Sequence, residues 1–335
     1  MAQTAANAAY AYATALTLAL LVAGCSEQLD AGSTRPRGLL PVDERNPVIL
    51  TNDGAFDNWV GEYAVLLANG GGSELAAIVV SASPAWPKLE ENIAGWRGLV
   101  EAARKSGLKN IPAPTPSFNS RLTVPSSGKI EDTAAKGSEG AQAIVELSAK
   151  LSLPYRPVVI VTGGALTDIA DAYLIDPGVV DRVVVVSSLG ALDATGAAMA
   201  MPNGEMDPWA DRIVTTHFRY IQVSAFYDQL ADVPDSRRLD LPKNELGDWM
   251  RAKQPRIFEI SVASDQVALL AASLPGFAVA VQKVTATMPT SADSGVAPHL
   301  TLDPSGTIQL VNETAGPLAS ARLWELLLSR STFSK

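Results

Sequence analysis

The stretch Pro47-Val-Ile-Leu-Thr-Asn-Asp-Gly-Ala-Phe-Asp-Asn58 decides the fold. Its first four residues are apolar, and polar residues follow them directly. An unbroken apolar run of this length indicates a strand that is buried on both faces, as in a parallel sheet. The residues after it bring two carboxylates and two amides to one strand end. Ligands bind at the carboxyl ends of such strands, so we expect the chemistry of the protein here.

Short apolar runs alternate with amphipathic stretches through the rest of the chain. This alternation predicts an α/β fold with a mostly parallel central sheet and helices on both faces. We expect strands at residues 47–50, 75–80, 158–161, 183–186, 220–223 and 279–285. We expect helices at residues 59–69, 89–105, 133–150, 166–173 and 262–272, and a long loop over the residues 113–130, which are rich in Pro, Ser, Thr and Gly.

The N-terminus has the pattern of an export signal. Residues 10–24 are apolar or small, and they lead to Leu21-Val22-Ala23-Gly24-Cys25. The run is short for a membrane span and stands where a signal peptide has its apolar region. Its end is similar to a lipobox, in which the cysteine becomes the lipidated first residue. An ordinary cleaved signal or a buried helix is the alternative.

From these features we predict a lipoprotein signal peptide over residues 1–25, a flexible tether over 26–46 and one folded domain over 47–335. Cys25 would then anchor the protein to a membrane of the bacterial cell envelope, and Ser26 is compatible with the outer membrane. With one cysteine in the chain, an internal disulfide framework is excluded.

Composition limits the partners. The chain has 335 residues, 47% of them hydrophobic, which suffices for one large core. Its formal net charge of -9 disfavours nucleic acids as partners, because an acidic surface repels a phosphate backbone. A neutral small molecule meets no such repulsion.

Several of the polar candidates also have purely structural interpretations. Asp57 or Asn58 would serve equally as the N-cap of the helix expected from Trp59, and Asp265 as the N-cap of the helix that follows it. Trp86 would serve as a packing residue at the rim of a site.

The order of the motifs resembles the inosine-uridine preferring nucleoside hydrolase family over roughly residues 47–285. That family carries D-x-D-x-x-x-D-D directly after its first strand, and this chain has Thr51-x-Asp53-x-x-x-Asp57-Asn58. Segments similar to the family's G-P-L-T-N-I-A, E-F-N and H-D-x-x-A follow in the same order, at residues 163–170, 201–203 and 264–268.

The resemblance implies hydrolysis of the N-glycosidic bond of a ribonucleoside to base and ribose by a Ca²⁺-bound water, as in purine and pyrimidine salvage. Carried over by position, the Ca²⁺ ligands are Asp53, Asn58, the carbonyl of Gly163, and Asp265. Asp53 is also implied as the base that takes the proton of the water. The residues implied to bind the nucleoside are Asp57, Ser83, Trp86 and Asn203.

Other positions depart from the family. Asn58 stands in place of an Asp, which removes one negative charge and predicts weaker Ca²⁺ binding. Further replacements are Thr51, Ser83, Met201 and Ser264. They leave two alternatives open: a catalytically impaired lipoprotein that binds nucleosides or sugars, and an unrelated hydrolase of the same topology. The oligomeric state is also open, a homo-oligomer included.

Overall fold

The computed structural model describes residues 40–55, 59–69, 73–84, 86–118, 120–188, 190–192, 198–200, 202–224, 233–253, 265–288 and 298–334. The predicted signal peptide with Cys25 lies outside these residues, as do Asp57, Asn58, Met201 and Ser264. Within the described part of the chain, no helix is both long and apolar enough to cross a membrane.

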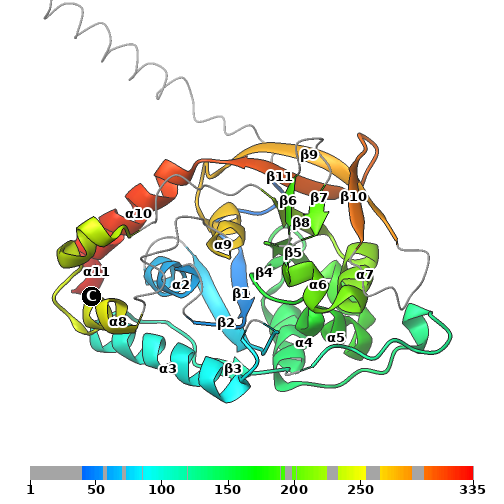
Figure 1. Ribbon diagram of the computed structural model, residues 1–335, viewed down its shortest axis with the longest axis horizontal. Coiled ribbons are helices and arrows are strands. Elements are labelled where there is room, and N and C mark those ends of the chain that lie inside the picture. Colours follow the sequence, from blue (N-terminus) through cyan, green and yellow to red (C-terminus); the bar gives the residue numbers. More distant parts are fainter. Residues whose placement is uncertain are drawn as a thin grey trace, which may run out of the picture. The chain divides into compact units, whose positions relative to one another are not determined.

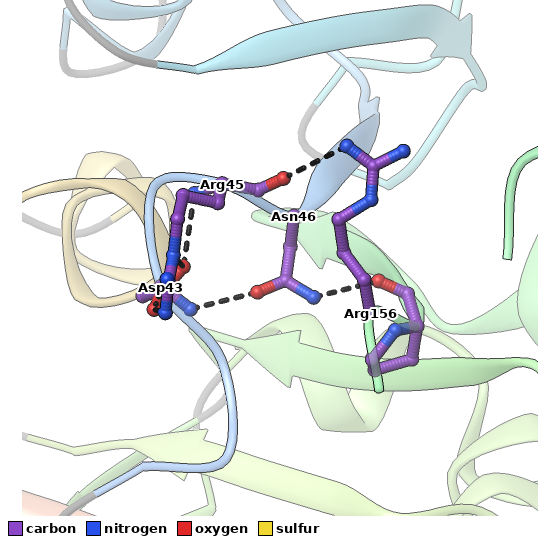
Figure 2. A network of polar contacts seen from close by, with 5 residues as sticks. Asp43, Arg45, Asn46 and Arg156 are labelled. Atoms are coloured by element: carbon purple, nitrogen blue, oxygen red, sulfur yellow. Dashed lines mark hydrogen bonds and ion pairs between the residues drawn. The ribbon is translucent and has the colours of Figure 1, made fainter. Parts of the chain in front are cut away.

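The folded unit begins at Leu40, ahead of the boundary at residue 47 that the composition suggested. Val42 is buried in the core. The side chain of Asn46 accepts a hydrogen bond from the Asp43 amide at 2.9 Å (Figure 2). It also donates one to the Pro157 carbonyl at 2.7 Å. Residues 40–46 therefore belong to the folded unit, because Leu40 and Val42 pack on the core and the Asn46 side chain bonds to the Pro157 carbonyl.

A nine-stranded sheet forms the centre of the unit, in the order β10-β9-β11-β8-β5-β4-β1-β2-β3. The strands from β11 to β3 in this order are parallel, and β9 is antiparallel to both its neighbours. This confirms the predicted mostly parallel sheet. The bounds are β1 Pro47–Asn52, β2 Glu74–Val80, β3 Pro114–Pro116, β4 Val158–Thr162, β5 Val183–Ser187, β8 Tyr220–Val223, β9 Ala278–Thr287, β10 His299–Leu302 and β11 Ile308–Thr314. A separate antiparallel pair consists of β6 (Gly190–Leu192) and β7 (Ala198–Ala200).

Helices cover both faces of the sheet, as predicted (Figure 1). One face carries α2 (Val60–Ala68), α3 (Leu89–Lys105), α8 (Glu245–Lys253), α9 (Gln266–Ser273) and α10 (Gly316–Leu328). The other face carries α4 (Glu139–Leu151), α5 (Thr167–Ile175) and α7 (Pro208–His217). The shorter helices are α6 (Pro202–Met206), α11 (Arg330–Phe333) and the 3-10 turns η1 (Ile130–Asp132), η2 (Pro177–Asp181) and η3 (Asp235–Asp240).

Strand β1 shows why the pattern specifies a central strand. Val48 and Leu50 pack into the core under the first set of helices, whereas Ile49 packs into the core on the opposite face. Successive side chains of a strand point to opposite faces, so a strand between two helical layers needs apolar residues at every position.

Two expected elements differ from the structure. The helix expected at 133–150 begins only at Glu139, because the Ser138 hydroxyl caps it by accepting a hydrogen bond from the Ala141 amide at 3.0 Å. The loop expected at 113–130 contains β3, which pairs with β2. A three-residue strand with proline at both ends gives no periodic signal.

The sheet order brings the important strand ends together. The chain passes from β1 to β2 and β3 on one side, then returns to β4 on the other side of β1. In register, Asn52 stands beside Val80, Thr51 beside Thr162, and Thr162 beside Ser187. This reversal is the point at which open α/β sheets bind ligands.

Candidate functional site

The end of β1 is a buried polar turn. Asp53 is 2% exposed, and its Oδ1 accepts a hydrogen bond from the Gly54 amide at 2.7 Å. The Asp53 carbonyl accepts a second one from Trp96 Nε1 at 3.1 Å. The turn is thus held by a hydrogen bond from Trp96 of helix α3 and by a second one between the Asp53 carboxylate and the Gly54 amide.

Asp265 lies at the same strand end although it is far from Asp53 in sequence. It is 3% exposed and takes the N-cap position of α9, but its side chain makes no capping hydrogen bond. Instead its Oδ2 lies 3.4 Å from Asn52 Nδ2 and its Oδ1 lies 3.4 Å from Asn203 Nδ2. Its carboxylate therefore faces the strand ends, which distinguishes it from a simple cap.

Gly163 allows this close approach. A Cβ at this position would lie 2.5 Å from both Asn52 Nδ2 and Asp265 Cβ, distances at which real Cβ atoms do not occur. The Gly163 amide also donates to the Thr51 carbonyl at 3.3 Å, which joins the ends of β4 and β1. Glycine at this position removes the side chain that would otherwise separate the strand end from α9.

Oxygen atoms from separate elements converge on the carboxamide of Asn203 on α6. Its Nδ2 lies 2.5 Å from the Gly163 carbonyl, 2.8 Å from the Ser188 carbonyl and 3.4 Å from Asp265 Oδ1. An amide nitrogen has two hydrogens, so it cannot satisfy three acceptors fully. Two carbonyls and a carboxylate grouped in this way are oxygen donors of the kind that Ca²⁺ accepts.

Two buried polar atoms without hydrogen-bond partners also favour a cation at this strand end. Asn52 Oδ1 and Thr51 Oγ1 are buried and have no hydrogen-bond partner within the described residues. A buried polar atom without a partner is costly unless water or an ion completes it. No group of three or more acidic, histidine or cysteine side chains that could hold a metal ion occurs in the described ranges, which exclude Asp57 and Asn58. The donors at hand, carbonyl, amide and carboxylate oxygens, fit Ca²⁺.

Ser83 and Trp86 form a tight turn after β2. The Ser83 amide donates to the Trp86 carbonyl and the Trp86 amide donates to Ser83 Oγ, both at 3.0 Å. The Trp86 ring lies against Gly54, where a Cβ would come within 2.5 Å of its Cε2 atom. The half-buried indole therefore stands beside the Asp53 turn, in reach of a ligand there.

The structure thus brings together Asp53, Gly163, Asn203 and Asp265, with Ser83 and Trp86 beside them. Two participants were missed: Asn52 and the Ser188 carbonyl. Asn52 stands inside the quoted motif, and its burial at a strand end was the available signal. The Ser188 carbonyl carries no side-chain signal at all.

Next to this site lies a buried group of carboxyls between α5 and α7. Burial raises the pKa of Asp168 to about 7, helped by the neighbouring charges of Asp171 and Asp207, while a hydrogen bond from Ser117 opposes the shift. Burial likewise raises the pKa of Asp211 to about 8. Both side chains are buried.

These shifts predict stability that declines as pH rises. A carboxyl whose pKa is higher in the folded state holds its proton better when folded, so the folded state loses its advantage between about pH 4 and about pH 8. We expect Asp168→Asn to raise the unfolding free energy at pH 8 by on the order of a few kcal/mol, because the amide avoids the buried charge. Urea melts at pH 4 to 9 should show a flatter profile than the wild type. The exposed Asp132→Asn is the control, and an unchanged slope in Asp168→Asn contradicts the prediction.

Comparison with known proteins gives a fold match alone. No family model matches the chain, and no curated protein matches it by sequence. A plant nucleoside hydrolase is similar at a TM-score of 0.58 and 15% identity, covering 87% of this chain and 100% of the other. An inosine-guanosine nucleoside hydrolase has a TM-score of 0.60 and 15% identity, with 84% and 98% covered. An inosine-uridine preferring nucleoside hydrolase from Bacillus anthracis has a TM-score of 0.58 and 17% identity, with 84% and 99% covered. The chain therefore has the fold of these nucleoside hydrolases.

Proposed function

We propose that this protein hydrolyses the N-glycosidic bond of a ribonucleoside, using Ca²⁺. The observation that carries the proposal is the convergence of the Gly163 and Ser188 carbonyls and the Asp265 carboxylate beside the buried Asp53. These groups stand at the strand-order reversal of a fold that solved nucleoside hydrolases share.

The chain's own residues supply the remaining chemistry. Asp53, Asp265 and the Gly163 carbonyl would hold the cation, together with Asn58 outside the described residues. When bound, Ca²⁺ supplies an orienting charge for the ribose diol and lowers the pKa of water. Asp53 would take a proton from the attacking water, whose oxygen would bond to C1′ as the bond from C1′ to the base nitrogen breaks. The leaving base would take up a proton from solvent, which balances the one held by Asp53.

Other side chains would position the nucleoside. Asp57 accepts a hydrogen bond from a ribose hydroxyl, and Ser83 and Asn203 offer further polar contacts. Trp86 would stack on the base, because its half-buried ring lies against Gly54 in the Asp53 turn.

The second candidate, a binding protein that has lost catalysis, is favoured by two contacts. The Asn203 amide bonds to the Gly163 carbonyl, so it competes with a cation for that oxygen. The Ser83 hydroxyl is likewise engaged by the Trp86 amide.

Two measurements separate these functions. Calorimetric titration with Ca²⁺ tests the cation, and a reducing-sugar assay over purine and pyrimidine nucleosides tests cleavage. Sugar release that disappears with a chelator and returns with Ca²⁺ supports the hydrolase. Nucleoside binding without any release of sugar supports the binding protein, and neither binding nor release contradicts both.

We also propose that Cys25 is lipidated and anchors the protein to the bacterial cell envelope. The support is the Leu21-Val22-Ala23-Gly24-Cys25 sequence after an apolar run. Replacing Cys25 with Ser should move the protein from the membrane fraction to the soluble fraction. Equal fractionation of the two forms would count against the anchor.

A further inference from the structure

A cavity of about 240 Å³ opens at the same edge of the sheet as Asp53. Ser83 from the β2 end, Ala165 after the β4 end, Thr167 of α5 and Met206 of α6 line it, with Ser120 and Arg121 from the loop after β3. Helix α6 links the two sites, since Asn203 contacts the Gly163 carbonyl and Met206 lines the cavity. A space of this size suits a small fragment, because whole drug-sized ligands occupy roughly 300 Å³ or more.

Among the described residues that line the cavity, several offer hydrogen-bond donors, none has a carboxylate, and Arg121 is the one with a charge. Its Nε donates to the Met206 carbonyl and its Nη2 to the Glu205 carbonyl at 2.8 Å, which fixes the guanidinium. Nη1 has no hydrogen bond within the described residues, so both its hydrogens remain available to a ligand.

The hydroxyls around the cavity are also oriented as donors. Ser83 Oγ accepts from the Trp86 amide, and Ser120 Oγ accepts from Lys136 Nζ at 2.6 Å. Each hydroxyl hydrogen is then free to point elsewhere. Lys136 also donates to the Ser120 carbonyl at 3.2 Å and to the Arg121 carbonyl, which brings a second cation to the loop.

The carboxylate of Asp207, which attracts Arg121, does not cancel this arrangement. Its oxygens accept from the Leu122 amide at 2.8 Å, the Thr167 hydroxyl at 2.9 Å and the Ala210 amide at 3.1 Å. It is 2% exposed and lies behind the cavity wall. The cavity offers one guanidinium and two hydroxyls, which favour an anion. This is unusual on a chain whose net charge is -9.

We infer that this cavity binds the 5′-phosphate of a ribosyl ligand, so that the preferred substrate is a nucleoside 5′-monophosphate. The inference rests on the proposed function, which places the ribose over Asp53. The C5′ atom of the ribose would then be directed along α6. Water then adds at C1′, the bond to the base breaks, and the base leaves with a proton. The products are base and ribose 5-phosphate, and the phosphate ester stays intact.

The test measures binding separately from cleavage. Dissociation constants of the full chain are determined for ribose 5-phosphate, ribose and inorganic phosphate. Charge-assisted hydrogen bonds to phosphate predict that ribose 5-phosphate binds roughly 10- to 100-fold tighter than ribose. Arg121→Gln should remove that advantage, and Arg121→Lys should restore part of it.

Arg219→Gln is the matched control. Like Arg121, Arg219 donates from Nε and Nη2 to two backbone carbonyls, those of Val183 and Asp181, both at 3.2 Å. It directly precedes β8, at the amino ends of β5 and β8, whereas Asp53 follows the carboxyl end of β1. A loss of stability from an uncapped carbonyl would appear in both variants, whereas loss of phosphate affinity should appear only at Arg121.

The outcomes separate the two proposals. Equal affinity for ribose and ribose 5-phosphate, or an advantage that survives Arg121→Gln, overturns the phosphate site. If inorganic phosphate binds as tightly as ribose 5-phosphate, the cavity does not recognise the ribosyl group, and the proposed ribosyl phosphate site is overturned. If uridine is cleaved and ribose 5-phosphate has no advantage, the hydrolase stands and this inference fails. If no nucleoside or nucleotide is cleaved but the Arg121-dependent advantage is present, the site stands and the hydrolase fails.

Discussion

Asp53→Asn should lower the turnover number for nucleoside cleavage by roughly 10²- to 10⁴-fold, the range typical of removing a general base. An amide keeps an oxygen for the Gly54 amide, so the turn at the end of β1 should hold. The variant loses the negative carboxylate, which would accept the proton from water and attract the cation. Asp53→Ala should lose at least as much activity, because it also removes the oxygen that closes the turn.

The assay must separate a loss of catalysis from a loss of bound Ca²⁺. Turnover of Asp53→Asn is therefore measured at Ca²⁺ concentrations that saturate the variant, with calorimetry defining saturation and a thermal melt reporting the fold. The exposed Asp132→Asn serves as the charge-matched control. Turnover near the wild-type value in Asp53→Asn would remove Asp53 from the mechanism and leave the carbonyl cluster as a binding site.

The centre of the fold was predictable because local patterns determine it. The strands β1, β2, β4 and β5 are apolar at nearly every position, and burial between two helical layers requires that pattern. Helix α3 was predicted with the bounds that it has, Leu89–Lys105, since apolar spacing and a Ser-Gly end mark it.

The C-terminal part was harder to predict for a physical reason. Strand β11 pairs in parallel with β8 and in antiparallel orientation with β9, and this pairing continues the sheet beyond the six strands from β3 to β8. Its sequence, IQLVNET, mixes apolar and polar residues because it borders the antiparallel edge. Such a pattern fits an edge strand or a loop equally, so only long-range pairing decides it.

The candidate site was predictable where a side chain carries the chemistry and not where the backbone does. Asp53 and Asp265 stand out in the sequence as acids beside predicted apolar elements. The Ser188 carbonyl and the donor role of Asn203 depend on where the end of β5 meets α6, which no local pattern encodes. The capping alternative for Asp265 was decided only by the geometry of α9, where the carboxylate turns away from the helix amides.

Gly163→Ala is expected to damage the site more than any other change of one methyl group. The new Cβ would stand 2.5 Å from Asp265 Cβ and 2.6 Å from Asp265 Cγ. Atoms next to the main chain of α9 cannot swing aside as a flexible side-chain end would, so the end of β4 and the start of α9 must separate. Overpacking of this kind costs about 1–3 kcal/mol of stability.

The functional loss should exceed the loss of stability, because the separation moves the Asp265 carboxylate away from the Gly163 carbonyl that would bind the same cation. We expect Ca²⁺ affinity and nucleoside cleavage to fall together in Gly163→Ala while the protein still folds. Gly164→Ala is the matched control one residue along, since its Cβ would stand 3.6 Å from the Asp53 amide nitrogen, an ordinary contact. The prediction is contradicted if the two variants lose Ca²⁺ affinity equally, or if Gly163→Ala binds Ca²⁺ as the wild type does. Ca²⁺ binding would then not depend on the contact between the end of β4 and the start of α9. A thermal melt of both variants separates this result from general unfolding.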